Sequence, residues 1–371
     1  MSGAEATRYH LDRLVRDAKV PGIQYLAIAP ERIVFEYAGG WADVAGRRPL
    51  TASTTMMAYS MSKTITAAAV LQLVEAQRAK LDDPIDVYLE SQPYGPDVTV
   101  GQLLSHTSGV PNPIPLRWVH AAARHDTLDE QAALASVLLE HPKLSSRPGT
   151  KYRYSNIGYW LLGRMVERVT GEPFSSYVRK HVLQPLGITP QELGYVVPDY
   201  RDHAKGYLEK YSLMNVAKRF VIAREFIGSY EGRWLHIRDH YVNGAAFGGL
   251  VGSARGFGKV LQDQLRPHSV LFADTTHQLF FAPQRTNDGT SISMTLGWQI
   301  EAVNRVRFFY KEGAGAGFHS MMRVYLSSGI ATVVMVNATT FDVRELLDAM
   351  DSRFLPATER HLAAKSAARE S

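Results

Sequence analysis

The chain has 371 residues, of which 45% are hydrophobic and 21% charged, which is typical of a globular protein with one large or two intertwined domains. Its net charge of +5 is spread along the sequence. The nearest approach to a basic run, KRFVIAR at 218–224, is interrupted by apolar residues, so nucleic acid is not an expected partner. The absence of cysteine excludes disulfides, thiolate metal ligands and a cysteine nucleophile.

The sequence also predicts no membrane partner. The N-terminal residues mix charges throughout and lack the apolar core of a secretory signal. No later segment approaches the length of a membrane span. We therefore expect a soluble cytoplasmic protein, and the sequence does not indicate its oligomeric state.

The first elements predicted are a helix and a hairpin. Residues 4–18 have the spacing of an amphipathic helix, and 22–30 and 32–40 resemble two strands joined by a short polar turn at Glu31. The middle of the chain, 60–245, is dominated by helical patterns interrupted by loops rich in proline and glycine.

Strands return near the C-terminus. Four stretches form a predicted meander, and a last helix begins near Asp342. The stretches are 294–302, 305–311, 318–328 and 329–339. Short antiparallel strands at both ends of a helical middle predict an α+β fold, in which one antiparallel sheet is built from both termini and flanked by helices, with a mostly helical lobe inserted.

This organisation predicts two domains. The sheet domain is discontinuous and comprises 1–59 and 246–356, and the mostly helical domain comprises 60–245. The tail at 357–371 is interpreted as a frayed helix or a disordered segment.

The stretch AYSMSKTITAAAVLQLVE at 58–75 places Ser60 and Lys63 three residues apart at the start of a helix meant for burial. No carboxylate stands three or four residues from Lys63 to neutralise it, so the lysine either points into water or is held for chemistry. Roughly one Ser-x-x-Lys pairing is expected by chance in such a chain, and this pair alone therefore favours an exposed lysine.

Three further fragments change that balance. They are LLSHTSGVP at 103–111, PGTKYRYSNIGYWLLG at 148–163 and KEGAGAGFHS at 311–320. Together with SMSK they resemble, in order and spacing, the serine β-lactamase and penicillin-binding-protein superfamily, particularly its class C and family VIII carboxylesterase branch. The resemblance runs from about residue 8 to 354 and implies a β-lactamase-like fold. The Tyr-x-Asn motif of the superfamily is matched at 154–156, within the fragment 148–163. The same pattern occurs again at 241–243, but without the sequence that surrounds it in that fragment.

The chemistry of the residues agrees with this resemblance. Ser60 would be the nucleophile, and Lys63, one turn further along the helix, can reach it. A lysine with an ordinary pKa cannot act as a base at neutral pH, but desolvation and a nearby cation lower its pKa, and Lys311 could be that cation. Tyr154 would shuttle a proton between Ser60 and the leaving group. Whether Lys63 or Tyr154 is the general base stays open.

The resemblance also implies an oxyanion site made of the backbone amides of Ser60 and Ala314. Gly313, Gly315 and Gly317 would let substrate approach the strand edge without obstruction, although glycines in this pattern also suit a simple hairpin. Asn156 could contact substrate or cap the helix that follows it.

Other polar residues have simpler explanations. His106 and Ser108 are expected to brace the loop beside the site, and Trp298 is expected to pack in the core. HIRDH at 236–240 offers two histidines at helical spacing but no obvious third ligand, so no metal site is predicted.

Glu312 departs from the motif of the superfamily, which has threonine between the lysine and the glycine. If Glu312 faces the cleft, its charge disfavours substrates that carry a carboxylate and favours uncharged esters. If it pairs with Lys311 or turns outward, that preference has no basis.

The sequence thus predicts a serine hydrolase that forms an acyl-enzyme, acts on a small-molecule ester or amide, most plausibly as a carboxylesterase, and needs no cofactor. Alternatives with the same fold are a β-lactamase, a D,D-peptidase or an acyltransferase. An alternative of another class is a binding or sensor protein that is acylated without turnover. No Gly-x-Ser-x-Gly elbow, zinc-protease helix or phosphate loop is present in the sequence.

Overall fold

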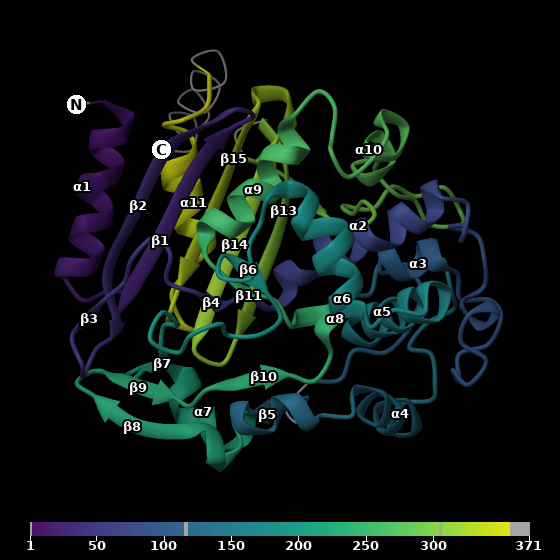
Figure 1. Cartoon of the computed structure of the whole chain (residues 1–371), viewed down its shortest axis with the longest axis horizontal. Coiled ribbons are helices and arrows are strands. Elements are labelled where there is room, and N and C mark those ends of the chain that lie inside the picture. Colours follow the sequence, from purple (N-terminus) through teal and green to yellow (C-terminus); the bar gives the residue numbers. More distant parts are fainter. Residues whose placement is uncertain (1, 115–117, 304–305, 357–371) are drawn as a thin grey trace.

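A seven-stranded antiparallel sheet joins the two ends of the chain in the computed structural model, which describes residues 2–114, 118–303 and 306–356 (Figure 1). In spatial order its strands are β12 (Gln299–Val303), β13 (Val306–Gly315), β14 (Phe318–Tyr325), β15 (Ile330–Val336), β1 (Gly22–Ala29), β2 (Arg32–Asp43) and β3 (Arg48–Pro49). β15 lies between β14 and β1, with Ile23 opposite Val336. The predicted sheet built from both termini is confirmed, and the predicted tail lies outside the described residues.

Both faces of the sheet are covered, and β1 shows how its sequence meets two cores. Tyr25 packs on one side against α1 (Gly3–Arg16) and α11 (Val343–Asp351). Leu26, the next residue, packs on the other side with α9 (Ala254–Leu265) and the helical region. Because successive side chains of a strand point to opposite faces, a strand covered on both sides is apolar at nearly every position.

The helical region centres on α2 (Ser62–Glu75), which follows the short 3₁₀ helix Tyr59–Met61. Eleven of the fourteen residues of α2 are buried, which explains why its apolar residues surround the whole helix instead of forming one stripe. The other helices of this region are α3 (Val100–Leu104), α4 (Glu130–Glu140), α5 (Asn156–Thr170), α6 (Phe174–Val178), α8 (Ala245–Gly248) and α10 (Asp274–Phe280).

The middle of the chain contains more strand than predicted. A three-stranded sheet is formed by β7 (Gly206–Glu209), β9 (Trp234–Ile237) and β8 (Ile227–Glu231), and α7 (Leu213–Val221) lies between β7 and β8 in sequence (Figure 1). Two smaller sheets are also present. One pairs β5 (Val119–Ala121) with β10 (His240–Val242), and the other joins β4 (Met56–Met57), β11 (Val251–Gly252) and β6 (Leu193–Gly194).

These strands correct the interpretation of HIRDH. His236 lies on β9 and His240 on β10, so the helical spacing assumed for the two histidines is wrong. In the described part of the chain, no group of three or more His, Asp or Glu side chains is placed to hold a metal ion. The division into two domains stays a prediction, because the strands of the main sheet and the helical region share one continuous hydrophobic core.

Within the described ranges, none of the helices combines the length and the apolar character needed to cross a lipid bilayer.

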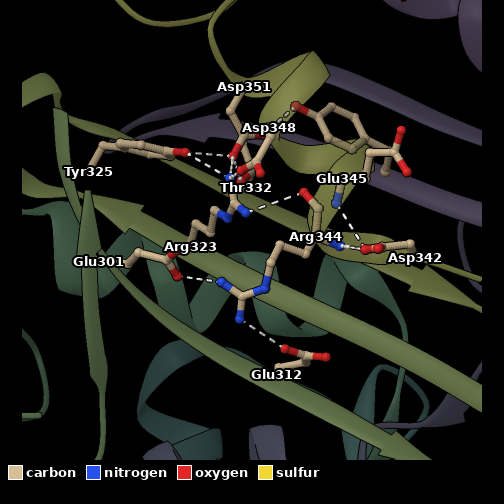
Figure 2. A network of polar contacts seen from close by, with 11 residues as sticks. Glu301, Glu312, Arg323, Tyr325, Thr332, Asp342, Arg344, Glu345, Asp348 and Asp351 are labelled. Carbon is tan, nitrogen blue, oxygen red and sulfur yellow. Dashed lines mark hydrogen bonds and ion pairs between the residues drawn. The ribbon is translucent and has the colours of Figure 1, made fainter. Parts of the chain in front are cut away.

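A buried ionic network ties α11 to the face of the sheet (Figure 2). The Arg323 side chain is 1% exposed and lies 2.7 Å from Asp348 and 3.6 Å from Asp351. The hydroxyls of Tyr325 and Thr332 also donate to Asp351. Burial raises the pKa of Asp351 to about 6, and Arg323 partly opposes that rise. The charged form of Asp351 therefore depends on the neighbouring cation of Arg323.

We expect Arg323→Met to lower the free energy of unfolding by about 3 to 5 kcal/mol, because it leaves Asp351 buried without its cation. Since the pKa of Asp351 in the folded protein, about 6, lies above its ordinary value of 3.8, the folded chain binds more protons than the unfolded chain between these pH values. Stability therefore falls as pH rises through that window, and more steeply in the variant. Urea unfolding at pH 5 and pH 8 measures both effects.

Arg307→Met is the control, because Arg307 is exposed on the same sheet and its loss should change stability by less than about 0.5 kcal/mol. An equal loss in the two variants would show that Arg323 does not compensate Asp351.

Candidate active site

Ser60, Lys63 and Tyr154, which were predicted from two separate motifs, meet in the structure. Lys63, in the first turn of α2, places its Nζ 2.9 Å from Ser60 Oγ. Tyr154, in the loop that leads into α5, donates its hydroxyl to the same Oγ at 2.7 Å. The helical spacing of three residues puts Ser60 and Lys63 on one face, as the sequence predicted.

Lys63 is buried among neutral groups. Its side chain has no exposed surface, and Nζ also donates to Asn156 Oδ1 at 2.8 Å and to the Phe247 carbonyl at 2.6 Å. Burial first, and then the positive charge of Lys311, hold the pKa of Lys63 well below its usual value. A neutral amine has two N–H groups, which these two acceptors engage, so its lone pair is left facing Ser60 Oγ.

Lys311 supplies the neighbouring cation that the sequence suggested. It projects from β13, is fully buried, and its pKa is lowered by burial to about 7. Its Nζ lies 5.1 Å from the ring centroid of Tyr154, and the Nζ of Lys63 lies 4.9 Å from the same centroid. Among the described residues Lys311 Nζ has no hydrogen-bond partner, so its action on the site is electrostatic.

Tyr154 remains a protonated phenol, because burial raises its pKa. Its ring packs 4.4 Å from that of His106, whose Nδ1 accepts a hydrogen bond from the Ser155 amide. Ser108 Oγ accepts from the Val110 amide within the same loop. His106 and Ser108 thus brace the loop beside the site, as expected from the sequence.

Asn156 is not the cap of α5. Ser155 is the cap, since its Oγ accepts from the Gly158 amide at 2.9 Å, and this leaves the amide side chain of Asn156 free to contact Lys63. The capping interpretation of Asn156 is therefore wrong. Serine is as good a cap as asparagine, and the sequence offered both side by side.

The glycines of β13 make room for the protein itself. β12 pairs with β13 only as far as Tyr310, which leaves one edge of 311–315 without a strand partner. A Cβ at Gly313 would lie 2.0 Å from the Ala58 carbonyl oxygen and 3.1 Å from the Ser60 amide nitrogen. Glycine thus lets the turn that carries Ser60 lie against this edge, a role that the sequence did not indicate. That these glycines also admit substrate stays a prediction.

Glu312 does not face the site. It follows Lys311 on the strand and therefore points to the opposite face of the sheet. There its carboxylate accepts a hydrogen bond from His319 at 2.8 Å. It also accepts one from Arg344 at 3.1 Å (Figure 2). Of the orientations that the sequence left open, the structure shows the outward one, so Glu312 gives no basis for a preference for uncharged esters. Strand alternation could have shown this, because a buried Lys311 requires an outward Glu312.

A cavity of about 210 Å³ opens beside Ser60. Its lining is mostly apolar and aromatic, and the described lining residues include no lysine, arginine, aspartate or glutamate. They are Tyr59, Ser60, Ile114, Trp118, Val119, Asn156, Ile222, Ala223, Phe226, His240, Val242, Phe247, Gly248, Ala314, Gly315 and Ala316. Apart from Ser60, Asn156, Ala314 and Gly315, the sequence did not indicate these residues, because they come from elements far apart in the chain.

Comparison with known proteins identifies the family. A sequence model of the Beta-lactamase family matches residues 8–353. The chain belongs to the Beta-lactamase family. This family comprises serine hydrolases and includes penicillin-binding proteins, which confirms the resemblance seen in the motifs.

Individual relatives are distant. Penicillin-binding protein 4* of Bacillus subtilis is 25% identical over 315 residues, which cover 82% of this chain and 65% of that protein. A penicillin-binding protein from Bacillus halodurans has a TM-score of 0.70 at 25% identity, covering 92% of this chain and 98% of the other. D-amino acid amidase from Ochrobactrum anthropi SV3 has a TM-score of 0.78 at 20% identity, covering 95% and 99%. The chain spans 32% to 65% of the lengths of the curated relatives that it matches.

We expect Lys311→Met to move the acid limb of the kcat/KM profile to higher pH. A lysine that acts as a base must be neutral, and the charge of Lys311 is one cause of the lowered pKa of Lys63, so removing that charge raises the pKa of Lys63. Rates measured with a neutral p-nitrophenyl ester from pH 5 to 10 give the shift. Lys180→Met, at an exposed lysine, is the control and should leave the profile unchanged. If the acid limb stays in place in Lys311→Met, the charge of Lys311 does not set the pKa of Lys63.

Proposed function

We propose that the chain is a serine hydrolase that forms an acyl-enzyme on Ser60 and acts best on small, uncharged carboxylic esters with an apolar group. The observation that carries this proposal is the contact of Ser60 Oγ with Lys63 Nζ and the Tyr154 hydroxyl at the opening of an apolar cavity.

In the proposed reaction Lys63 is the general base. Its neutral amine takes the proton of Ser60 as Oγ bonds to the carbonyl carbon of the ester, and the carbonyl oxygen becomes negatively charged. The amides of Ser60 and Ala314 stabilise that oxygen. The Tyr154 hydroxyl passes a proton to the leaving alkoxide and is replenished from Lys63. A water then attacks the acyl carbon and loses its proton to the same amine. The bond between the acyl carbon and Ser60 Oγ breaks, the amine returns the proton to Oγ, and the acid is released.

The preference for uncharged substrates comes from the cavity. A carboxylate moved into an apolar site without a cation loses its hydration and gains no partner. The described lining residues offer no arginine or lysine, which disfavours anionic β-lactams and D-alanyl peptides. They offer no carboxylate either, so the free ammonium of an amino-acid amide is also unsupported, although the fold is shared with a D-amino acid amidase.

We expect Ser60→Ala to lower p-nitrophenyl butyrate hydrolysis by at least about a thousandfold, because it removes the nucleophile. Lys63→Arg should fail to a similar degree, since a guanidinium keeps its proton and is too large for the buried site. Steady-state rates and covalent labelling by a fluorophosphonate, located by mass spectrometry, measure both.

Lys259→Arg, at a surface lysine paired with Glu192, is the matched control and should retain full activity. Release of more than one equivalent of p-nitrophenol per chain distinguishes turnover from a binding protein that is acylated once. Labelling of Ser60→Ala at another residue would move the nucleophile elsewhere.

We expect kcat/KM for p-nitrophenyl hexanoate to exceed that for the mono-p-nitrophenyl ester of adipic acid by roughly 100-fold. The two acyl chains have the same length, and only the second ends in a carboxylate that the apolar cavity cannot solvate. Ala223→Lys places a cation in the exposed part of the lining and should reduce the ratio of the two kcat/KM values. The reduction should be smaller at high salt, because salt screens the added charge.

Ala132→Lys, on the exposed surface of α4, is the control for added charge and should leave the ratio unchanged. A ratio near one in the wild-type protein would remove the basis for the proposed preference.

A further inference from the structure

Tyr59, the residue before the nucleophile, has a backbone conformation that is unusual for its side chain. Its φ of 45° lies in the left-handed region, where a residue with a Cβ is disfavoured. The side chain is nevertheless only 6% exposed. Strain of this kind persists only where the surrounding contacts impose it, and it gathers at functional sites.

The contacts of Tyr59 lead to the strand that carries Ala314. Its ring lies against Gly315, where a Cβ would come within 2.4 Å of the ring, so glycine is required at that position. Its hydroxyl donates to the Ala316 carbonyl at 2.6 Å. The ring and the hydroxyl therefore hold the two residues that directly follow Ala314, while the backbone of Tyr59 continues into Ser60.

His240 lies on the other side of the same hydroxyl. Its Nδ1 lies 2.9 Å from the Arg238 carbonyl, which can only accept, so Nδ1 carries the proton of the neutral ring. Nε2 is then an acceptor 3.1 Å from the Tyr59 hydroxyl and competes with the Ala316 carbonyl for its single proton. The proposed reaction gives His240 no role, although it lines the cavity.

We infer that Tyr59 is a positioning residue that sets the separation of the Ser60 and Ala314 amides, and that His240 acts through its hydroxyl. The inference rests on the proposed function, because it concerns the oxyanion site of that reaction. Two amides on different segments stabilise one developing charge only if the segments keep a fixed spacing. Tyr59 is bonded to one segment and packs against the other, so it can supply that constraint.

The test is Tyr59→Phe, which keeps the ring on Gly315 and removes the bond to Ala316. We expect kcat for p-nitrophenyl butyrate to fall about 10-fold with KM within about twofold, because an oxyanion donor acts mainly in the transition state. The rate of phosphonylation of Ser60 by a fluorophosphonate should fall by a similar factor, since that adduct also places an oxygen between the two amides.

Tyr94→Phe is the matched control. The Tyr94 hydroxyl also donates to a backbone carbonyl, that of His141, and its side chain is 5% exposed, but it lies outside the cavity lining. Both variants lose one hydrogen bond and should show similar small losses of thermal stability. Only Tyr59→Phe should lose rate, which a purely structural role would not produce.

His240→Asn completes a double-mutant cycle. We expect it to change kcat by more than about twofold when introduced alone and to have no further effect in the Tyr59→Phe background, because both changes act on one hydroxyl. A kcat within twofold of wild type in Tyr59→Phe would overturn the role of Tyr59, and an undiminished effect of His240→Asn in the double variant would overturn the link to His240. Failure of the wild-type protein to be phosphonylated on Ser60 would instead overturn the proposed function, and the inference with it.

Discussion

The site depends on an amine kept out of water. Lys63 is fully buried with three hydrogen-bonding contacts to neutral atoms, an arrangement that a charged ammonium would tolerate poorly. The surrounding structure serves this condition. α2 is buried on nearly all sides, α8 presents the Phe247 carbonyl, and α5 presents Asn156 because Ser155 has taken the capping position. The burial of the Lys63 side chain thus depends on residues from three separate helices, α2, α5 and α8.

β13 carries a charged residue toward each face of the sheet, Lys311 on the inner face and Glu312 on the outer face. On its inner face Lys311 acts at a distance on Lys63 and Tyr154, in a place where charge is costly. On its outer face Glu312 is satisfied by His319 and Arg344 and contributes to the network that anchors α11. Adjacent residues of one strand therefore point to opposite faces and have different partners, although the charge of Glu312 still contributes to the raised pKa of Tyr154.

The sequence was sufficient to predict that the side chains of Ser60, Lys63 and Tyr154 lie together, because each belongs to a motif whose local spacing or order carries information. It was also sufficient to predict one sheet built from both ends of the chain, since the hydrophobic strands at the two ends can bury their surfaces by pairing with each other. It failed where three-dimensional context decides. The orientation of Glu312 stayed open because the motif was considered without strand alternation. The strands of 206–242 were missed because each has five residues or fewer, and β10 pairs only with the distant β5.

The position of β15 between β14 and β1 has a consequence for how the chain reaches its native state. The N-terminal hairpin cannot complete its sheet until residues more than 300 positions later have been made, as the pairing of Ile23 with Val336 requires. Contacts this distant in sequence slow folding, because a long loop must close before they form. Lys311 arrives with the same late segment. Ser60 and Lys63 therefore meet Lys311 only after that segment has been made, and a partly made chain lacks one of the two causes that lower the pKa of Lys63.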